Sequence, residues 1–81
     1  MNLSNNYLTS VKNALKILKC FTMDEPEKRV IDISEELDLN KSTVSRTLST
    51  LESEGFVYKI PETNRYRLGL TIVTLSGIVN N

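Results

Sequence analysis

The stretch Ile33–Gly55, ISEELDLNKSTVSRTLSTLESEG, predicts a short helix, a tight turn and a second, longer helix. In the longer helix Val44, Leu48 and Leu51 follow the spacing i, i+4, i+7, so at about 100° per residue they share one narrow stripe. A surface helix packs such a stripe against a core. We therefore expect this helix to bury one face and to end at Gly55, which tolerates left-handed backbone.

The opposite face of the longer helix consists of small polar residues and one arginine. The acids Glu52 and Glu54 are confined to the last turn, whereas an ordinary solvated face carries Lys and Glu in i, i+4 pairs. Ser and Thr are mediocre helix formers. They do, however, place short donors and acceptors where a polar surface can approach closely. The face comprises Ser42, Thr43, Arg46, Ser49, Thr50 and Ser53.

The shorter helix and the turn complete this arrangement. Ile33 and Leu37 are the inward positions of the shorter helix, and Leu39 anchors the turn. Asn40 is expected to cap the longer helix through its side-chain oxygen. Two helices that cross over a short turn, the second with a small polar face, are typical of a DNA-binding helix-turn-helix. For this stretch alone, the alternative is a pair of antiparallel helices in a small bundle.

Charge is distributed unevenly along this chain of 81 residues, which is long enough for one small domain. The formal net charge of zero argues mildly against a nucleic-acid partner. However, residues 1–23 carry three lysines and no acid, and residues 24–40 carry seven acids against two bases. From Lys41 onward, five bases face three acids. The sequence is therefore polarised, with its bases placed in and after the helix-turn-helix.

Composition also excludes several classes of protein. Cys20 is the single cysteine, so there is no internal disulfide, and its position predicts a half-buried, inert thiol. The chain shows no secretion signal and no apolar run of membrane-spanning length, which predicts a soluble, cytoplasmic protein without a membrane partner. It contains no His, no metal-ligand cluster and no catalytic carboxylate pair, which predicts no enzyme, metal or cofactor. Lys41-Ser42-Thr43 lacks the upstream glycines of a phosphate-binding loop.

The N-terminal part of the chain predicts an arm and one helix. Residues 1–9 are polar and aperiodic, as in a flexible arm. Ser10 is expected to cap a helix that runs to about Phe21. Its expected inward arc is Val11, Ala14, Leu15, Leu18 and Phe21, with Ile17 at the margin. Lys12, Lys16 and Lys19 form a separate stripe that is either solvated or in contact with phosphates.

The connection to the helix-turn-helix is a loop over residues 22–28, because Pro26 and the acids prevent the helix from continuing. Residues 29–31 predict a very short strand. Asp32 then offers a capping box with Glu35 at the start of the next helix.

After Gly55 the pattern changes to alternation, which predicts a β-hairpin. FVYKI and RYRL are joined by the turn 61–64, in which Asn64 can adopt positive φ. Tyr66 and Leu68 share one face, and the arginines at 65 and 67 share the other, with Lys59 expected across the hairpin from them. Because an isolated hairpin is unstable in water, this wing should lean on the helices through Phe56 and Tyr66.

The last segment, 70–81, predicts a helix that is apolar on two sides. A helix that is apolar all round is buried on more than one side. This chain has too few other elements to surround it, so a second copy or downstream residues should cover it. One side comprises Ile72, Leu75 and Val79, and the other Leu70, Val73 and Ile78.

In four places the sequence resembles the N-terminal domain of the IclR family of bacterial and archaeal transcription regulators. The segments are Ser10-Val11-x-x-Ala14-Leu15-x-Ile17-Leu18-x-x-Phe21, Leu39-Asn40-Lys41-Ser42-Thr43-Val44-Ser45-Arg46, Thr50-Leu51-Glu52-x-x-Gly55-Phe56-Val57 and Pro61-Glu62-Thr63-Asn64-Arg65-Tyr66-Arg67-Leu68-Gly69. The resemblance implies a dimeric DNA-binding regulator and, in a longer chain, a C-terminal domain that binds a small effector. We expect this chain to be the DNA-binding domain, cut just after a linker helix.

The chain also departs from the family pattern at several positions. Ser34 and Asp38 stand where the family usually has Ala and Gly, and Asn64 replaces a common Gly. Asp and Asn tolerate left-handed backbone, so the fold should persist. Asn40 replaces a common Pro, and Ser45 replaces a common His, which bears on base preference.

Together these features predict a mainly α fold with a small β-hairpin (α+β), a winged helix-turn-helix over 10–69 followed by a linker and dimerisation helix over 70–81. We expect a sequence-specific regulator, acting as a repressor, whose helix 41–54 enters the major groove of duplex DNA. The wing, 56–68, would contact the backbone or minor groove. The alternative is a winged-helix module that binds protein. The expected DNA contacts are Lys41, Ser42, Thr43, Ser45, Arg46, Ser49, Thr50, Lys59, Arg65 and Arg67.

Overall fold

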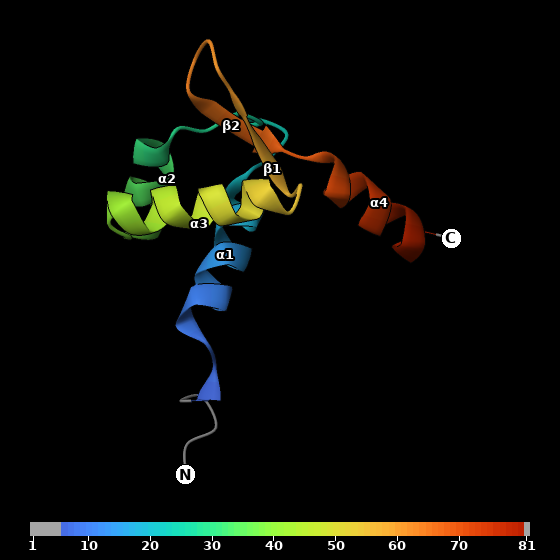
Figure 1. Ribbon diagram of the computed structural model, residues 1–81, viewed down its shortest axis with the longest axis horizontal. Helices are drawn as coiled ribbons and strands as arrows, with labels where there is room; N and C mark the ends of the chain where they lie inside the picture. The colour runs from blue at the N-terminus through green and yellow to red at the C-terminus, as the bar shows by residue number, and fades with distance from the viewer. Residues whose placement is uncertain (1–5, 81) are drawn as a thin grey trace.

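A computed structural model describes residues 6–80, which form four helices and one two-stranded antiparallel hairpin (Figure 1). The winged helix-turn-helix prediction is confirmed. The predicted arm lies largely outside the described residues, and Thr9 already belongs to the first helix. In chain order the elements are α1 (Thr9–Cys20), α2 (Val30–Leu37), α3 (Lys41–Ser53), β1 (Val57–Ile60), β2 (Arg65–Leu68) and α4 (Leu70–Val79).

The first helix differs from its prediction at both its start and its buried face. Leu8, not Ser10, is the N-cap of α1, and it makes no side-chain capping bond. Ile17, predicted at the margin, is fully buried, whereas Val11 and Leu15 are 51% and 54% exposed. The N-terminal half of α1 extends beyond the body of the domain, which leaves Val11 and Leu15 largely exposed (Figure 1).

The second helix begins earlier than predicted. It starts at Val30, so residues 29–31 are not a strand, and only Lys28 forms a bridge with Tyr66. Asp32 occupies the third helical position, where its carboxylate accepts hydrogen bonds from the Arg29 backbone N–H at 2.9 Å and from the guanidinium. The guanidinium first, and then that N–H, hold the pKa of Asp32 below its usual value. The expected Asp32–Glu35 box is thus wrong, because Asp32 reaches back toward Arg29.

The turn between α2 and α3 agrees with its prediction. Asp38 adopts left-handed backbone with φ of 55°, and Leu39 packs against the core. The Asn40 side-chain oxygen accepts the Thr43 backbone N–H at 2.8 Å, which caps α3. Gly55, with φ of +80°, follows the end of α3, and Asn64 takes φ of 59° in the hairpin turn. Asn40, Gly55 and Asn64 were predicted from local backbone chemistry, and the left-handed backbone at Asp38 was expected from the glycine that the family usually has there.

The core lies where α1, α2, α3 and the hairpin meet. Its buried members are Ile17, Cys20, Phe21, Ile33, Val44, Leu48, Val57 and Tyr66. Leu51 packs against this cluster from the last turns of α3, so the predicted Val44–Leu48–Leu51 stripe is confirmed. Cys20 is more deeply buried than expected, and burial is the main cause that raises the pKa of its thiol to about 11. The thiol therefore stays protonated at neutral pH.

The hairpin agrees with its prediction except at Lys59 and at Phe56, which is half-buried and does not belong to the core cluster. Its register pairs Lys59 with Tyr66, and directly paired residues of an antiparallel ladder point to the same face. Lys59 thus lies on the Tyr66 face, with its amine 6.0 Å from the ring centroid, and not beside the arginines. Tyr66 anchors the wing as predicted, and the fully buried Val57 is a second anchor that the sequence pattern did not indicate.

The last helix is joined to the domain near its first turn. The Gly69 N–H donates to the Phe56 carbonyl at 2.8 Å, and the Thr71 N–H donates to the Gly55 carbonyl at 3.1 Å. A Cβ at Gly69 would lie 2.4 Å from the Gly55 carbonyl oxygen, so only glycine fits there. Beyond this joint α4 projects from the body (Figure 1). Ile72 is half-buried, and the other apolar side chains of α4 are exposed, from 46% for Leu75 to 83% for Leu70.

None of the helices within residues 6–80 is long and apolar enough to span a membrane.

Candidate nucleic-acid interface

The outward face of α3 is open along its whole length. Val44 and Leu48 are fully buried, and Arg46 lies about 200° round the helix from each of them. This face therefore points away from the core. Lys41, Ser42, Ser45, Arg46, Ser49 and Thr50 are exposed, and Thr43 is half-buried.

The hydroxyl groups of this face fall into two classes. Ser42 donates its proton to the Asn40 side-chain oxygen at 2.9 Å, and Thr50 donates to the Arg46 carbonyl at 3.0 Å. These two hydroxyls can only accept from a ligand while those bonds persist. Within the described part of the chain, the side chains of Thr43, Ser45 and Ser49 take part in no hydrogen bond. Those three hydroxyls are available as donors, a distinction that the sequence pattern did not make.

The cations of α3 are likewise unengaged. No ion pair among residues 6–80 involves Lys41 or Arg46, and the first turn of α3 contains no acid. Lys41 stands at the positive end of the helix dipole, where backbone N–H groups favour an anion. The planar fork of Arg46 matches two acceptors of a guanine edge in the major groove. Among residues 6–80, the helix thus presents an unpaired cation and free N–H groups at its start, and an exposed guanidinium in its middle.

The basic residues of the wing are less concentrated than predicted. Arg67 makes an ion pair with Glu27, with its Nη1 2.8 Å from Oε2. Arg65 is half-buried on the same outer face and forms no ion pair within the described residues. Lys59 lies on the other face, beside Tyr66. Among residues 6–80, the wing cations without an ion pair are therefore Arg65 and Lys59.

A groove between α1 and α3 borders this surface. Its α1 wall contains Thr9, Ser10 and Asn13, to which the sequence analysis assigned no role in binding. Their small polar side chains at helical spacing are the one sequence signal for this wall. The whole lining is Thr9, Ser10, Val11, Asn13, Ala14, Thr43, Arg46, Thr47, Thr50 and Leu51.

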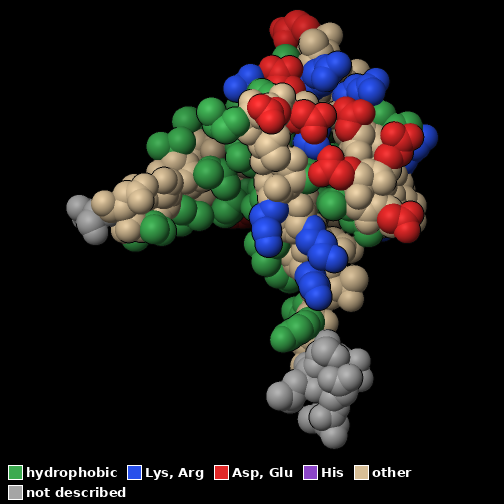
Figure 2. Space-filling view, turned by 180° about the vertical axis from the view of Figure 1, so that it is seen from behind, with side chains coloured by type: hydrophobic (Ala, Val, Ile, Leu, Met, Phe, Trp, Pro, Cys, Tyr) green, Lys and Arg blue, Asp and Glu red, His purple; other side chains and the backbone are tan. Residues whose placement is uncertain are grey.

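The lysine stripe of α1, formed by Lys12, Lys16 and Lys19, lies away from the groove. At about 100° per residue, the mean direction of these lysines is roughly 150° round α1 from the mean direction of its groove-lining residues. Figure 2 shows a row of basic side chains along α1 on the back of the molecule, below a group of acidic side chains. The lysine stripe and the outward face of α3 therefore belong to different surfaces.

These features occur together in a known family. Residues 10–61 match the family model described as the IclR helix-turn-helix domain. The chain belongs to the IclR helix-turn-helix family. The matched residues include α1 from its second residue, α2, α3 and β1, so the IclR domain covers all of α3's outward face. Helix-turn-helix domains place their second helix in the major groove, which makes DNA the ligand class of this family.

Individual relatives agree with this membership. The HTH-type transcriptional regulator XynR of Escherichia coli K12 is 39% identical over 66 residues, covering 82% of this chain and 26% of XynR. The IclR-family regulator from Brucella abortus superimposes with a TM-score of 0.87 at 28% identity, covering 93% of this chain and 28% of that one. The IclR regulator from Alicyclobacillus acidocaldarius superimposes with a TM-score of 0.84 at 35% identity, covering 88% of this chain and 29% of that one. The IclR domain described here thus spans between a quarter and a third of the length of these relatives.

Proposed function

We propose that this chain is the DNA-binding part of a transcription regulator and recognises duplex DNA by inserting α3 into the major groove. The observation that supports this most directly is the open face of α3. Among residues 6–80, its arginine forms no ion pair and three of its hydroxyls form no hydrogen bond, and the helix has no acid before its last turn. Arg46 reads a guanine, and Lys41 binds a phosphate. Thr43, Ser45 and Ser49 contact bases or phosphates near the start of the helix.

In this proposal the wing binds the DNA backbone or the minor groove beside α3. Arg65 and Lys59 are its first contacts, because neither forms an ion pair within residues 6–80. Arg67 contributes when its guanidinium exchanges the Glu27 carboxylate for a DNA phosphate. Ser42 and Thr50 serve as acceptors at the edges of the interface.

The dependence of binding on salt tests the DNA proposal. If Lys41, Lys59 and Arg65 of two subunits each neutralise one phosphate, log Kd should rise with log salt concentration with a slope of about 5. The measurement is a titration of a fluorescent duplex at several salt concentrations.

The matched control replaces the three lysines of the α1 stripe by Gln. These residues lie on a different surface, so the slope should stay unchanged. A wild-type slope near zero would contradict DNA binding. A slope that falls in the control variant would instead assign the α1 lysines to the interface.

We further propose that the regulator binds DNA as a homodimer that buries the apolar surface of α4. Leu70, Ile78 and Val79 are 83%, 69% and 82% exposed. A helix with so many apolar side chains is normally buried against another surface. A second copy of the chain offers the same apolar surface for a symmetric contact. Because α4 carries no charged residue, pairing two copies of α4 would bury no charge.

Self-association of the chain tests the homodimer. The double variant Val73→Glu, Ile78→Glu should sediment as a monomer at concentrations where the wild type is dimeric, because paired helices would bury two carboxylates per subunit. Met23→Glu is the matched control, since Met23 is 97% exposed and lies outside α4. It should leave the association constant unchanged. A wild-type chain that is strictly monomeric near millimolar concentration would refute the α4 interface.

A further inference from the structure

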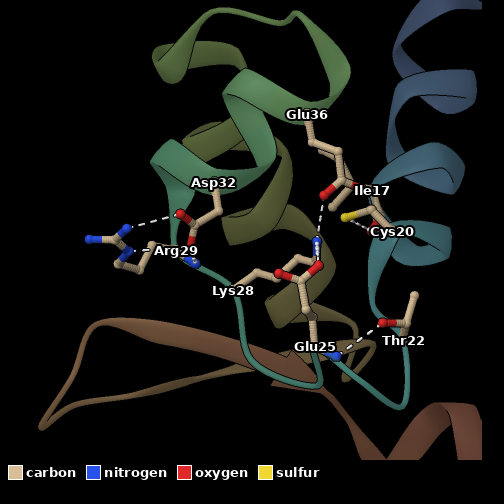
Figure 3. Close-up of polar contacts among 8 residues, drawn as sticks. All are labelled: Ile17, Cys20, Thr22, Glu25, Lys28, Arg29, Asp32 and Glu36. Carbon is tan, nitrogen blue, oxygen red and sulfur yellow. Dashed lines mark hydrogen bonds and ion pairs between the residues drawn. The ribbon is translucent and has the colours of Figure 1, made fainter.

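Lys28 is the one charged residue within 6–80 that is buried, at 3% exposure. Its amine lies 2.5 Å from a Glu36 carboxylate oxygen on α2 and 3.3 Å from Glu25 in the preceding loop (Figure 3). Burial alone lowers the pKa of Lys28, but the hydrogen bonds to Glu36 and Glu25 outweigh it, so the net direction is upward. The lysine therefore stays charged and bonded to α2 throughout the physiological range.

The backbone of the same residue is bonded to the wing. The Lys28 N–H donates to the Tyr66 carbonyl at 3.0 Å, and the Tyr66 N–H donates to the Lys28 carbonyl at 2.7 Å. Lys28 thus forms a one-residue third strand on the β2 edge of the hairpin. The preceding residue, Glu27, adds the ion pair with Arg67 of β2. One short segment therefore connects β2 to α2.

The opposite edge of the hairpin is connected to α3. The Lys59 backbone N–H of β1 donates to the Glu52 carboxylate at 3.1 Å, in the last turn of α3. Because a two-stranded hairpin has little stability of its own, these lateral bonds and the anchors Val57 and Tyr66 set its direction. On the β2 side Lys28 makes the lateral contacts, and it joins the wing to α2.

We infer that Lys28 is a positioning residue for DNA binding, which fixes the wing relative to α2 and α3 so that α3 and the wing contact one duplex together. This inference rests on the proposed function. Lys28 itself is buried and touches no DNA. It acts by preventing the wing from tilting about its base, which would separate Arg65 and Lys59 from the phosphates while Arg46 stays in the groove.

The test compares Lys28→Met in two backgrounds. Met keeps the unbranched stem and leaves no stranded charge, because the Glu25 and Glu36 side chains are 68% and 43% exposed. In the wild-type background it should weaken binding to the level of the wing variant Lys59→Ala, Arg65→Ala, on the order of tenfold for two lost phosphate contacts. In the wing-variant background it should have no further effect. A purely structural role would lower affinity equally in both backgrounds and would overturn the inference.

Hydrogen exchange provides a readout that does not involve DNA. Lys28→Met should speed exchange of the Tyr66 amide by about tenfold or more, the factor that loss of a charged hydrogen bond carries. Lys28→Arg, which keeps the charge, should restore both exchange and affinity in large part. Unchanged exchange in Lys28→Met would refute the connection between α2 and the wing. If Lys28→Met does not fold, Glu36→Gln removes the same charge pair from a half-exposed position and should give the same pattern.

The inference and the proposed function fail in different ways. A wing variant that binds as tightly as the wild type shows that the wing contacts no DNA. It overturns the inference and the wing contacts of the proposed function, but not the insertion of α3. A wing variant that binds weakly, combined with equal losses from Lys28→Met in both backgrounds, overturns only the role of Lys28.

Discussion

Arg46→Ala is expected to lower affinity for a selected DNA sequence by about 1–3 kcal/mol per half-site, while affinity for scrambled DNA falls much less. The guanidinium forms no ion pair in the described chain and lies opposite the buried stripe of α3, so its removal should not unfold the domain. The selected sequence comes from a random pool bound by the wild type. A competition titration against scrambled duplex then measures both affinities, with circular dichroism as the check on folding.

Lys41→Ala is the matched control for this experiment. Both residues are exposed cations of α3, but a phosphate contact carries no sequence identity. Lys41→Ala should therefore weaken selected and scrambled DNA by the same factor. If Arg46→Ala does so as well, Arg46 binds phosphate, and specificity belongs to Thr43, Ser45 and Ser49 or to the wing.

Leu48→Ala is expected to lower the free energy of unfolding by about 2–5 kcal/mol, because a fully buried leucine leaves both lost contacts and a cavity. Domains of this length have a total stability of about 4–12 kcal/mol, so the variant should be partly unfolded under mild conditions. Leu48 lies in α3, which contacts α1, α2 and β1, and no single neighbour can close the space. Urea denaturation followed by circular dichroism gives the change.

The same substitution at Leu70 provides the control. Leu70 is 83% exposed, so Leu70→Ala should change the free energy of unfolding of the monomer by no more than about 0.5 kcal/mol. It should instead weaken self-association if α4 forms the dimer contact. Equal stability losses at the two positions would contradict the packing described here.

The features of the fold that depend on local chemistry were predictable from the sequence. The Asn40 cap, the left-handed positions at Asp38 and Asn64 and the end of α3 at Gly55 each follow from one residue type and its backbone preference. The outward direction of Arg46 follows from helical period alone. For these reasons the turn, the start of α3 at Lys41 and the outward residues of α3 could be predicted from the sequence, whereas the start of α2 at Val30 could not.

The features that were predicted wrongly or missed depend on contacts between elements that are distant in the sequence. A helical wheel shows that α1 has an apolar arc, but only the positions of α2 and α3 decide that Ile17 faces them and that Leu15 does not. The side of the wing taken by Lys59 follows from the hairpin register. Nothing in the sequence around Lys28 indicates a buried amine, because Glu36 is eight residues away and Tyr66 belongs to the hairpin.

The close approach of Gly69 to Gly55 has a consequence for the geometry of an operator. Because α4 leaves the domain where α3 ends and the wing begins, its direction is fixed relative to the helix that reads the bases. In a symmetric dimer, that direction determines how far apart and how rotated the two reading helices are. Half-sites on one face of B-DNA recur about every 10.5 base pairs. In the proposed dimer, the preferred spacing between half-sites would therefore depend on a glycine joint that touches no base.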